Sequence, residues 1–139
     1  MRSKNVLLAG LAAGLVFNVA GMTSAVLIGL GESFARAGIS PQVGGAVIHL
    51  GLRFGLGLAA AYLYALACGR LGSGLGAAGR LAVPVWMIGY LPPVVLLHEI
   101  KFLTQNQAIL SALWGLLEAG AAIGVAIFVY NWMSRAKAR

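Results

Sequence analysis

The stretch IHLGLRFGLGLAAAYLYALA, residues 48–67, is almost entirely apolar, yet it contains His49 and Arg53. These two residues are four positions apart and share one face if the segment is helical. The stretch is close to the roughly 20 residues that an α-helix needs to cross the hydrocarbon core of a bilayer. A charged guanidinium at that depth is costly unless another group compensates it. Arg53 therefore predicts a polar interior in a membrane protein.

The composition of the whole chain also indicates a membrane protein. Hydrophobic residues make up 60% of the 139 positions and charged residues only 9%, whereas soluble domains have about 25% charged residues. The net charge of +7 does not predict a nucleic-acid partner, because the basic residues form no patch with interleaved aromatic residues. They lie mainly at the termini and in one loop. We expect them to contact membrane lipids, including anionic lipids on the cytoplasmic side.

Four apolar runs predict an all-α, four-transmembrane-helix bundle with up-down topology. The helices are expected at about residues 6–30, 45–69, 81–98 and 108–132, and residues 1–139 form a single integral membrane domain. The first run continues to Leu30, past the length of a signal-peptide hydrophobic region, so we expect a retained helix. The segment RLGSGLGAAGR, residues 70–80, is expected to be a flexible linker, and GESFARAGIS in the first outer loop a short turn of helix.

The basic residues predict the orientation of the four spans. With an even number of spans, both termini and the 70–80 segment lie on one side of the membrane, and Arg36 and Lys101 lie on the other. The first side holds Arg2, Lys4, Arg70, Arg80, Arg135, Lys137 and Arg139. Cytoplasmic segments carry the excess of Lys and Arg. We therefore expect a multi-pass protein of the bacterial inner (plasma) membrane with both termini cytoplasmic.

Prolines and glycines predict local features of the helices. Pro92 and Pro93 remove two backbone donors, so we expect them to kink the third helix, whereas Pro84 is expected near its start. The kink is either closely packed or opens a polar pocket. Pairs of glycines four residues apart allow close helix packing, either within the bundle or in a homo-oligomer. These pairs are Gly10 and Gly14, Gly51 and Gly55, and Gly120 and Gly124.

The positions of the three acidic residues offer an explanation for Arg53. Glu32 and Glu99 lie at the outer ends of predicted helices, and Glu118 lies within the fourth. At 1.5 Å per residue, Arg53 and Glu118 are about 12 Å and about 15 Å below the outer boundary. The matched depth predicts an ion pair that reduces the cost of either charge alone. The alternative is that Arg53 extends outward to Glu99 or Glu32.

Each predicted helix contributes a polar residue near this depth. The predicted buried polar cluster, which is also a possible ligand-binding site, consists of Asn18, His49, Arg53, Tyr90 and Glu118, with Ser111 and Trp114 on the face of Glu118. Three interpretations stay open. The cluster is a structural network that holds the bundle, a ligand or ion site, or a site of proton-coupled chemistry.

Cofactor and catalytic motifs are absent from the sequence. His49 and His98 both lie toward the outer side and raise the possibility of a bis-His haem, but nothing else marks a haem cavity, so we expect no cofactor. No His, Cys, Asp and Glu cluster has the spacing of metal ligands, and no nucleophile elbow or phosphate loop occurs. We therefore predict no metal site and no catalytic residues. An enzyme that uses Glu118 or His49 as acid or base is the weakest hypothesis.

Three stretches carry a resemblance to other proteins. LAGLAAGLVFNVAGM, GESFARAGIS and SALWGLLEAGAAIGVAIFVY together resemble a diffuse group of small bacterial four-helix integral membrane proteins. The resemblance implies the four-span topology and implies no activity, cofactor or site residue.

Two function classes follow from these features. The first is a non-enzymatic accessory, assembly or scaffold subunit of a membrane complex or homo-oligomer, which fits the small size and the glycine-rich faces. The second is a small carrier or binding protein for a lipid-like, quinone-like or anionic ligand that uses Arg53 and Glu118. Defined oligomers or a co-purifying partner favour the first class, and a cavity at the cluster favours the second.

Overall fold

The computed structural model describes residues 3–40, 42–72 and 74–136. Its elements are α1 (Ser3–Leu27), α2 (Leu30–Arg36), α3 (Val43–Leu71), α4 (Leu75–Gly89), α5 (Leu91–Glu99) and α6 (Gln105–Ala136). Four segments are long and apolar enough to cross a membrane, namely α1, α3, α4 together with α5, and α6. The predicted all-α bundle of four membrane helices is confirmed.

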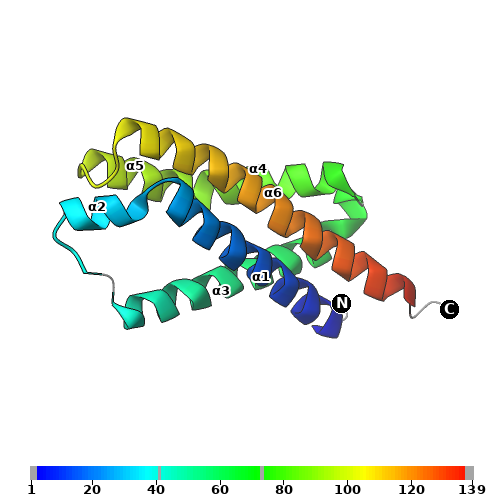
Figure 1. Ribbon diagram of the computed structural model, residues 1–139. Helices are drawn as coiled ribbons and strands as arrows, with labels where there is room; N and C mark the ends of the chain where they lie inside the picture. Colours follow the sequence, from blue (N-terminus) through cyan, green and yellow to red (C-terminus); the bar gives the residue numbers. More distant parts are fainter. Residues whose placement is uncertain (1–2, 41, 73, 137–139) are drawn as a thin grey trace.

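The four spans alternate in direction (Figure 1). The two termini and the α3–α4 connection lie at one end of the bundle, and α2 and the α5–α6 connection lie at the other. We call the end with the termini the terminal end and the opposite end the α2 end. Helices α1, α3 and α6 pack against one another, and α4 packs against α6 and α3. The up-down topology predicted from the sequence is therefore confirmed.

Small residues determine how closely α1 and α3 approach. A Cβ atom added to Gly57 would overlap backbone atoms of Gly10 and Gly14. Gly10 and Gly14 thus serve packing inside the bundle, where the fully buried core is also rich in alanine, including Ala13 and Ala61. In contrast, a Cβ added to a glycine of the other two predicted pairs meets nothing within 4 Å. These glycines are Gly51 and Gly55 on α3 and Gly120 and Gly124 on α6.

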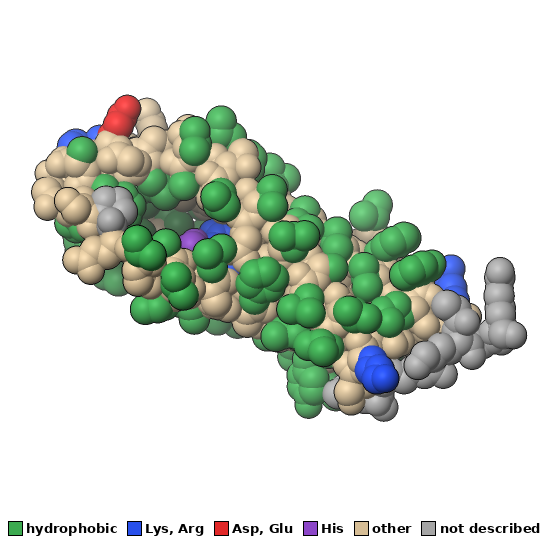
Figure 2. All heavy atoms as spheres, turned by 60° about the horizontal axis from the view of Figure 1, so that its bottom comes forward, with side chains coloured by type: hydrophobic (Ala, Val, Ile, Leu, Met, Phe, Trp, Pro, Cys, Tyr) green, Lys and Arg blue, Asp and Glu red, His purple; other side chains and the backbone are tan. Residues whose placement is uncertain are grey.

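The first half of α3 diverges from α1 toward the α2 end (Figure 1). Every residue from 42 to 52 is exposed on the surface of the bundle. Figure 2 shows a hollow near this end, walled by hydrophobic side chains, with a histidine and a basic side chain at its bottom. The divergence leaves an opening between α1 and α3 above these polar side chains.

The third span begins at Leu75 and not near residue 81. Helical structure covers most of the segment that we predicted to be a flexible linker, so that prediction was wrong. Gly72 and Gly74 adopt positive φ angles of 74° and 95°, which favour glycine; Ser73 lies outside the described residues. The early start also places Pro84 in the interior of α4.

The third span is interrupted at Tyr90, as its prolines predicted. Helix α4 ends at Gly89, and α5 begins at Leu91 with Pro92 and Pro93 in its first turn. Prolines are tolerated there because the first N–H groups of a helix have no acceptor within it. The Tyr90 N–H still donates to the Trp86 carbonyl at 2.9 Å. The predicted kink is therefore confirmed, and Tyr90 lies at the break.

The predicted turn of helix in the first outer loop is α2. A polar network fastens it to the start of α6. The Ser33 hydroxyl and an Arg36 N–H both donate to Gln107 Oε1, each at 3.1 Å, and Gln107 Nε2 donates to the Ile28 carbonyl at 3.0 Å. Ser33 and Gln107 are 1% and 8% exposed. The sequence carries no signal for this network, because its side chains are common polar residues in predicted loops.

Candidate functional site

Arg53 and Glu118 form an ion pair inside the bundle. A guanidinium N–H of Arg53 on α3 donates to Oε1 of Glu118 on α6, and the same nitrogen donates to the Phe17 carbonyl of α1. The Glu118 side chain is 2% exposed and the Arg53 side chain 13%. The pair thus lies where a single charge would be poorly solvated, and each charge compensates the other.

Two further side chains complete the arrangement. The Tyr90 hydroxyl donates to Glu118 Oε1 at 2.8 Å, and Arg53 Nε donates to His49 Nε2 at 2.7 Å. We call His49, Arg53, Tyr90 and Glu118, with the Phe17 carbonyl, the central cluster. All four spans contribute to it, because Tyr90 lies at the α4–α5 break and Phe17 lies on α1.

Two glycines make room for the central cluster. A Cβ atom on Gly21 would occupy the space of the Arg53 guanidinium, and a Cβ on Gly115 would lie 2.6 Å from Cδ1 of Tyr90. Gly21 on α1 therefore lets Arg53 reach across the bundle, and Gly115 on α6 leaves room for the Tyr90 ring, whose hydroxyl reaches Glu118. Both glycines lie three residues from a predicted polar residue, and that spacing was the only signal in the sequence for their role.

Asn18 lies near the central cluster without bonding to it. Its Nδ2 donates to the Gly14 carbonyl in its own helix at 2.9 Å, and its buried Oδ1 has no hydrogen-bond partner among the described residues. Asn18 and His49 instead line a pocket of about 200 Å³ between α1 and α3. The structure therefore brings together four of the five residues predicted to form the cluster and places the fifth beside them.

A separate cavity of about 150 Å³ borders the ion pair. Arg53, Tyr90 and Glu118 line it, together with Ser111 and Trp114, which the helical spacing predicted to share the face of Glu118. The Trp114 indole N–H donates to the Ala20 carbonyl at 3.0 Å and so ties α6 to α1. The cavity has room for several water molecules or a small ion, and it is smaller than the roughly 300 Å³ at which ligand pockets begin.

The two histidines have different partners. His49 accepts from Arg53, whereas Nδ1 of His98 lies 3.2 Å from the Leu103 carbonyl. Among residues 3–40, 42–72 and 74–136, no three His, Cys, Asp or Glu side chains lie close enough to hold a metal ion. The chemistry that the central cluster offers is thus a charged carboxylate–guanidinium pair with a phenol and an imidazole beside it.

Comparisons with protein-family models, with curated proteins and with solved structures each find no match for this chain.

Proposed function

We propose that the chain is a non-enzymatic membrane subunit that assembles, through helix packing, with a second copy of itself or with another subunit. In this proposal it belongs to the bacterial inner membrane, with both termini cytoplasmic. The observation that carries the proposal is an exposed face of α3. Gly51, Gly55 and Ala59 follow one another at four-residue spacing, and all three are exposed.

This α3 face has the character of a helix-packing surface. A Cβ added to Gly51 or Gly55 meets nothing within 4 Å, so the two glycines serve no contact inside the bundle. Small residues at this spacing let the backbones of two membrane helices approach closely and gain van der Waals contact. A helix that only faces lipid gains nothing from glycine, which costs about 1 kcal/mol relative to alanine in a helix interior.

The test is the size of the particle after extraction in a mild detergent. We expect the wild-type protein to elute as a defined oligomer or with a co-purifying subunit. Gly55→Leu should abolish the association without unfolding the bundle, because the new side chain points into open space. Gly79→Leu is the matched control, since Gly79 on α4 is equally open and lies on another helix. A strictly monomeric wild-type particle with no associated protein would contradict the proposal.

A second candidate function is a carrier or binding protein for a lipid-like, quinone-like or anionic ligand. The cavity of about 150 Å³ beside Arg53, Tyr90 and Glu118 favours it. A small molecule should then co-purify with the protein and be identifiable by mass spectrometry. Ser111→Leu, which would fill the cavity, should lose that molecule, whereas Thr23→Val at an exposed position of α1 should retain it. Purified protein without any bound small molecule would rule out this candidate.

A further inference from the structure

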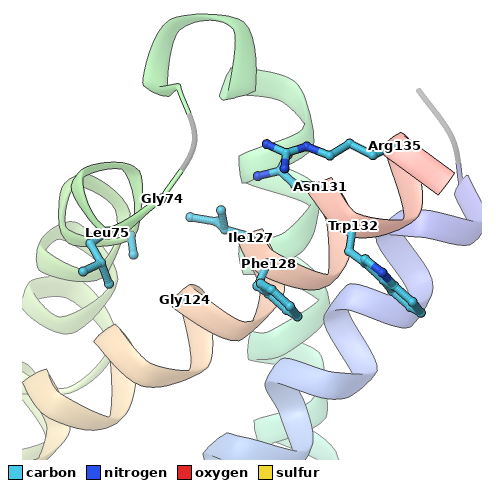
Figure 3. A pocket seen from close by; sticks show the side chains of 9 residues that line it. Gly74, Leu75, Gly124, Ile127, Phe128, Asn131, Trp132 and Arg135 are labelled. Atoms are coloured by element: carbon cyan, nitrogen blue, oxygen red, sulfur yellow. The ribbon is translucent and has the colours of Figure 1, made fainter. Parts of the chain in front are cut away.

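A groove of about 410 Å³ runs between the first turns of α4 and the last turns of α6 at the terminal end (Figure 3). Its wall is mainly apolar and includes Leu75 and Ala78 from α4 and Ile127 and Phe128 from α6. Leu75 is 89% exposed and Phe128 is 70% exposed on the surface of the bundle. The groove is thus an open, apolar trough on the outside of the bundle.

Arg135 and Trp132, both near the end of α6, line one end of this groove, and the Trp132 ring points away from the Arg135 guanidinium (Figure 3). In Figure 3 the Arg135 guanidinium extends from α6 toward the side of the groove formed by α4. No described residue forms an ion pair with Arg135, and the acidic residues of the chain lie elsewhere, in α2, at the end of α5 and in the middle of α6. The groove therefore combines an apolar wall with a guanidinium that lacks an acidic side-chain partner.

We propose that this groove binds one anionic phospholipid, with an acyl chain along Leu75, Ala78 and Phe128 and the phosphate at Arg135. Charge complementarity decides the class of ligand. A guanidinium binds phosphate oxygens through two parallel hydrogen bonds, and tryptophan is enriched at the depth where the headgroups lie. An apolar trough that ends at an arginine and a tryptophan matches an amphiphile with a negative headgroup.

The same geometry argues against a purely electrostatic lipid surface. Arg70 is exposed at the same end of the bundle but does not line the groove. If the positive charge alone attracted lipid, Arg70 and Arg135 would contribute equally, within the range of a Debye length. At a defined site, lipid binding instead depends on Arg135, which lies beside the apolar wall, and on the open space of the groove.

The proposal can be tested by native mass spectrometry of the full chain, released from detergent after titration with phosphatidylglycerol or phosphatidylcholine of identical acyl chains. We expect preferential retention of phosphatidylglycerol. Arg135→Gln should lower this preference about tenfold, the effect of losing a charge-assisted hydrogen bond to phosphate. Arg135→Lys should lower it less, and Arg70→Gln should leave it unchanged.

A second pair of variants tests the apolar part of the site. Gly124 lines the groove, and a Cβ there meets nothing within 4 Å, so Gly124→Leu fills the trough without disturbing the bundle. It should reduce retention of both phospholipids. Gly120→Leu, one turn away and equally open but outside the groove, should retain them as the wild type does.

Three results would overturn the proposal. Equal losses in Arg70→Gln and Arg135→Gln would indicate diffuse attraction, and equal retention in the two glycine variants would show that no acyl chain occupies the groove. Displacement of phosphatidylglycerol by soluble glycerol phosphate would indicate a simple anion site. The site does not depend on assembly through α3, because Gly55→Leu protein should keep the lipid preference even when it is monomeric.

Discussion

Gly21 on α1 lies directly against the guanidinium of Arg53 on α3, so that a single added methyl group would occupy the position of the charged group. The contact explains how a long charged side chain crosses the bundle to Glu118. Arg53 passes over Gly21, which has no side chain, and the nitrogen that donates to Glu118 also donates to the Phe17 carbonyl. The ion pair thus depends on a glycine as much as on the two charges.

Gly21→Ala should expel the guanidinium and separate the ion pair. We expect the free energy of unfolding in detergent to fall by about 3 kcal/mol or more, because a buried carboxylate loses its compensating charge. Gly79→Ala is the control, since a Cβ there meets nothing within 4 Å. Equal thermal stability of the two variants would show that Arg53 finds another route to Glu118.

Glu118→Gln should also destabilise the bundle, by about 3–5 kcal/mol, because it leaves Arg53 charged and uncompensated. The double variant Arg53→Met, Glu118→Leu should recover much of that loss, since it replaces both charges with apolar groups. Glu99→Gln, at an exposed acid of α5, should have little effect. If Glu118→Gln instead leaves folding intact and abolishes ligand binding, the pair serves binding and not stability.

Gln107→Ala should release α2 from the start of α6. Its side chain accepts from Ser33 and Arg36 and donates to the Ile28 carbonyl. The loss of these buried hydrogen bonds should lower the free energy of unfolding by about 1–3 kcal/mol. The rate of amide hydrogen exchange should rise in residues 30–36. Gln105→Ala, at an exposed position in the same turn, should change neither quantity. Unaltered exchange in α2 would show that other contacts hold it in place.

The proposed orientation can be checked by cysteine accessibility in a Cys68→Ala background. Single cysteines at positions 3, 75 and 136 should react from the cytoplasmic side, and those at positions 38 and 104 from the opposite side. The expectation follows from the excess of basic residues at the terminal end. Labelling of any position from the wrong side would contradict the topology.

The sequence by itself determined the number of spans and the break in the third. Both depend on local properties, namely the length of each apolar run and the backbone donors missing at Pro92 and Pro93. The match in depth between Arg53 and Glu118 was also accessible, because the rise per residue of a helix is fixed. The same reasoning failed at the α3–α4 connection, where glycine-rich sequence suggested a linker, whereas α3 continues to Leu71 and α4 begins at Leu75.

Only the tertiary structure decided which polar groups meet. Asn18 has a depth similar to that of Arg53, but its side chain bonds to its own helix, whereas Gly21, Gly115 and the Phe17 carbonyl complete the site. The groove beside Arg135 likewise combines residues from two helices that are distant in the chain. Depth along a helix follows from residue number, but the direction of a side chain turns by about 100° per residue. Which directions converge is therefore decided by the rotation and crossing of the packed helices.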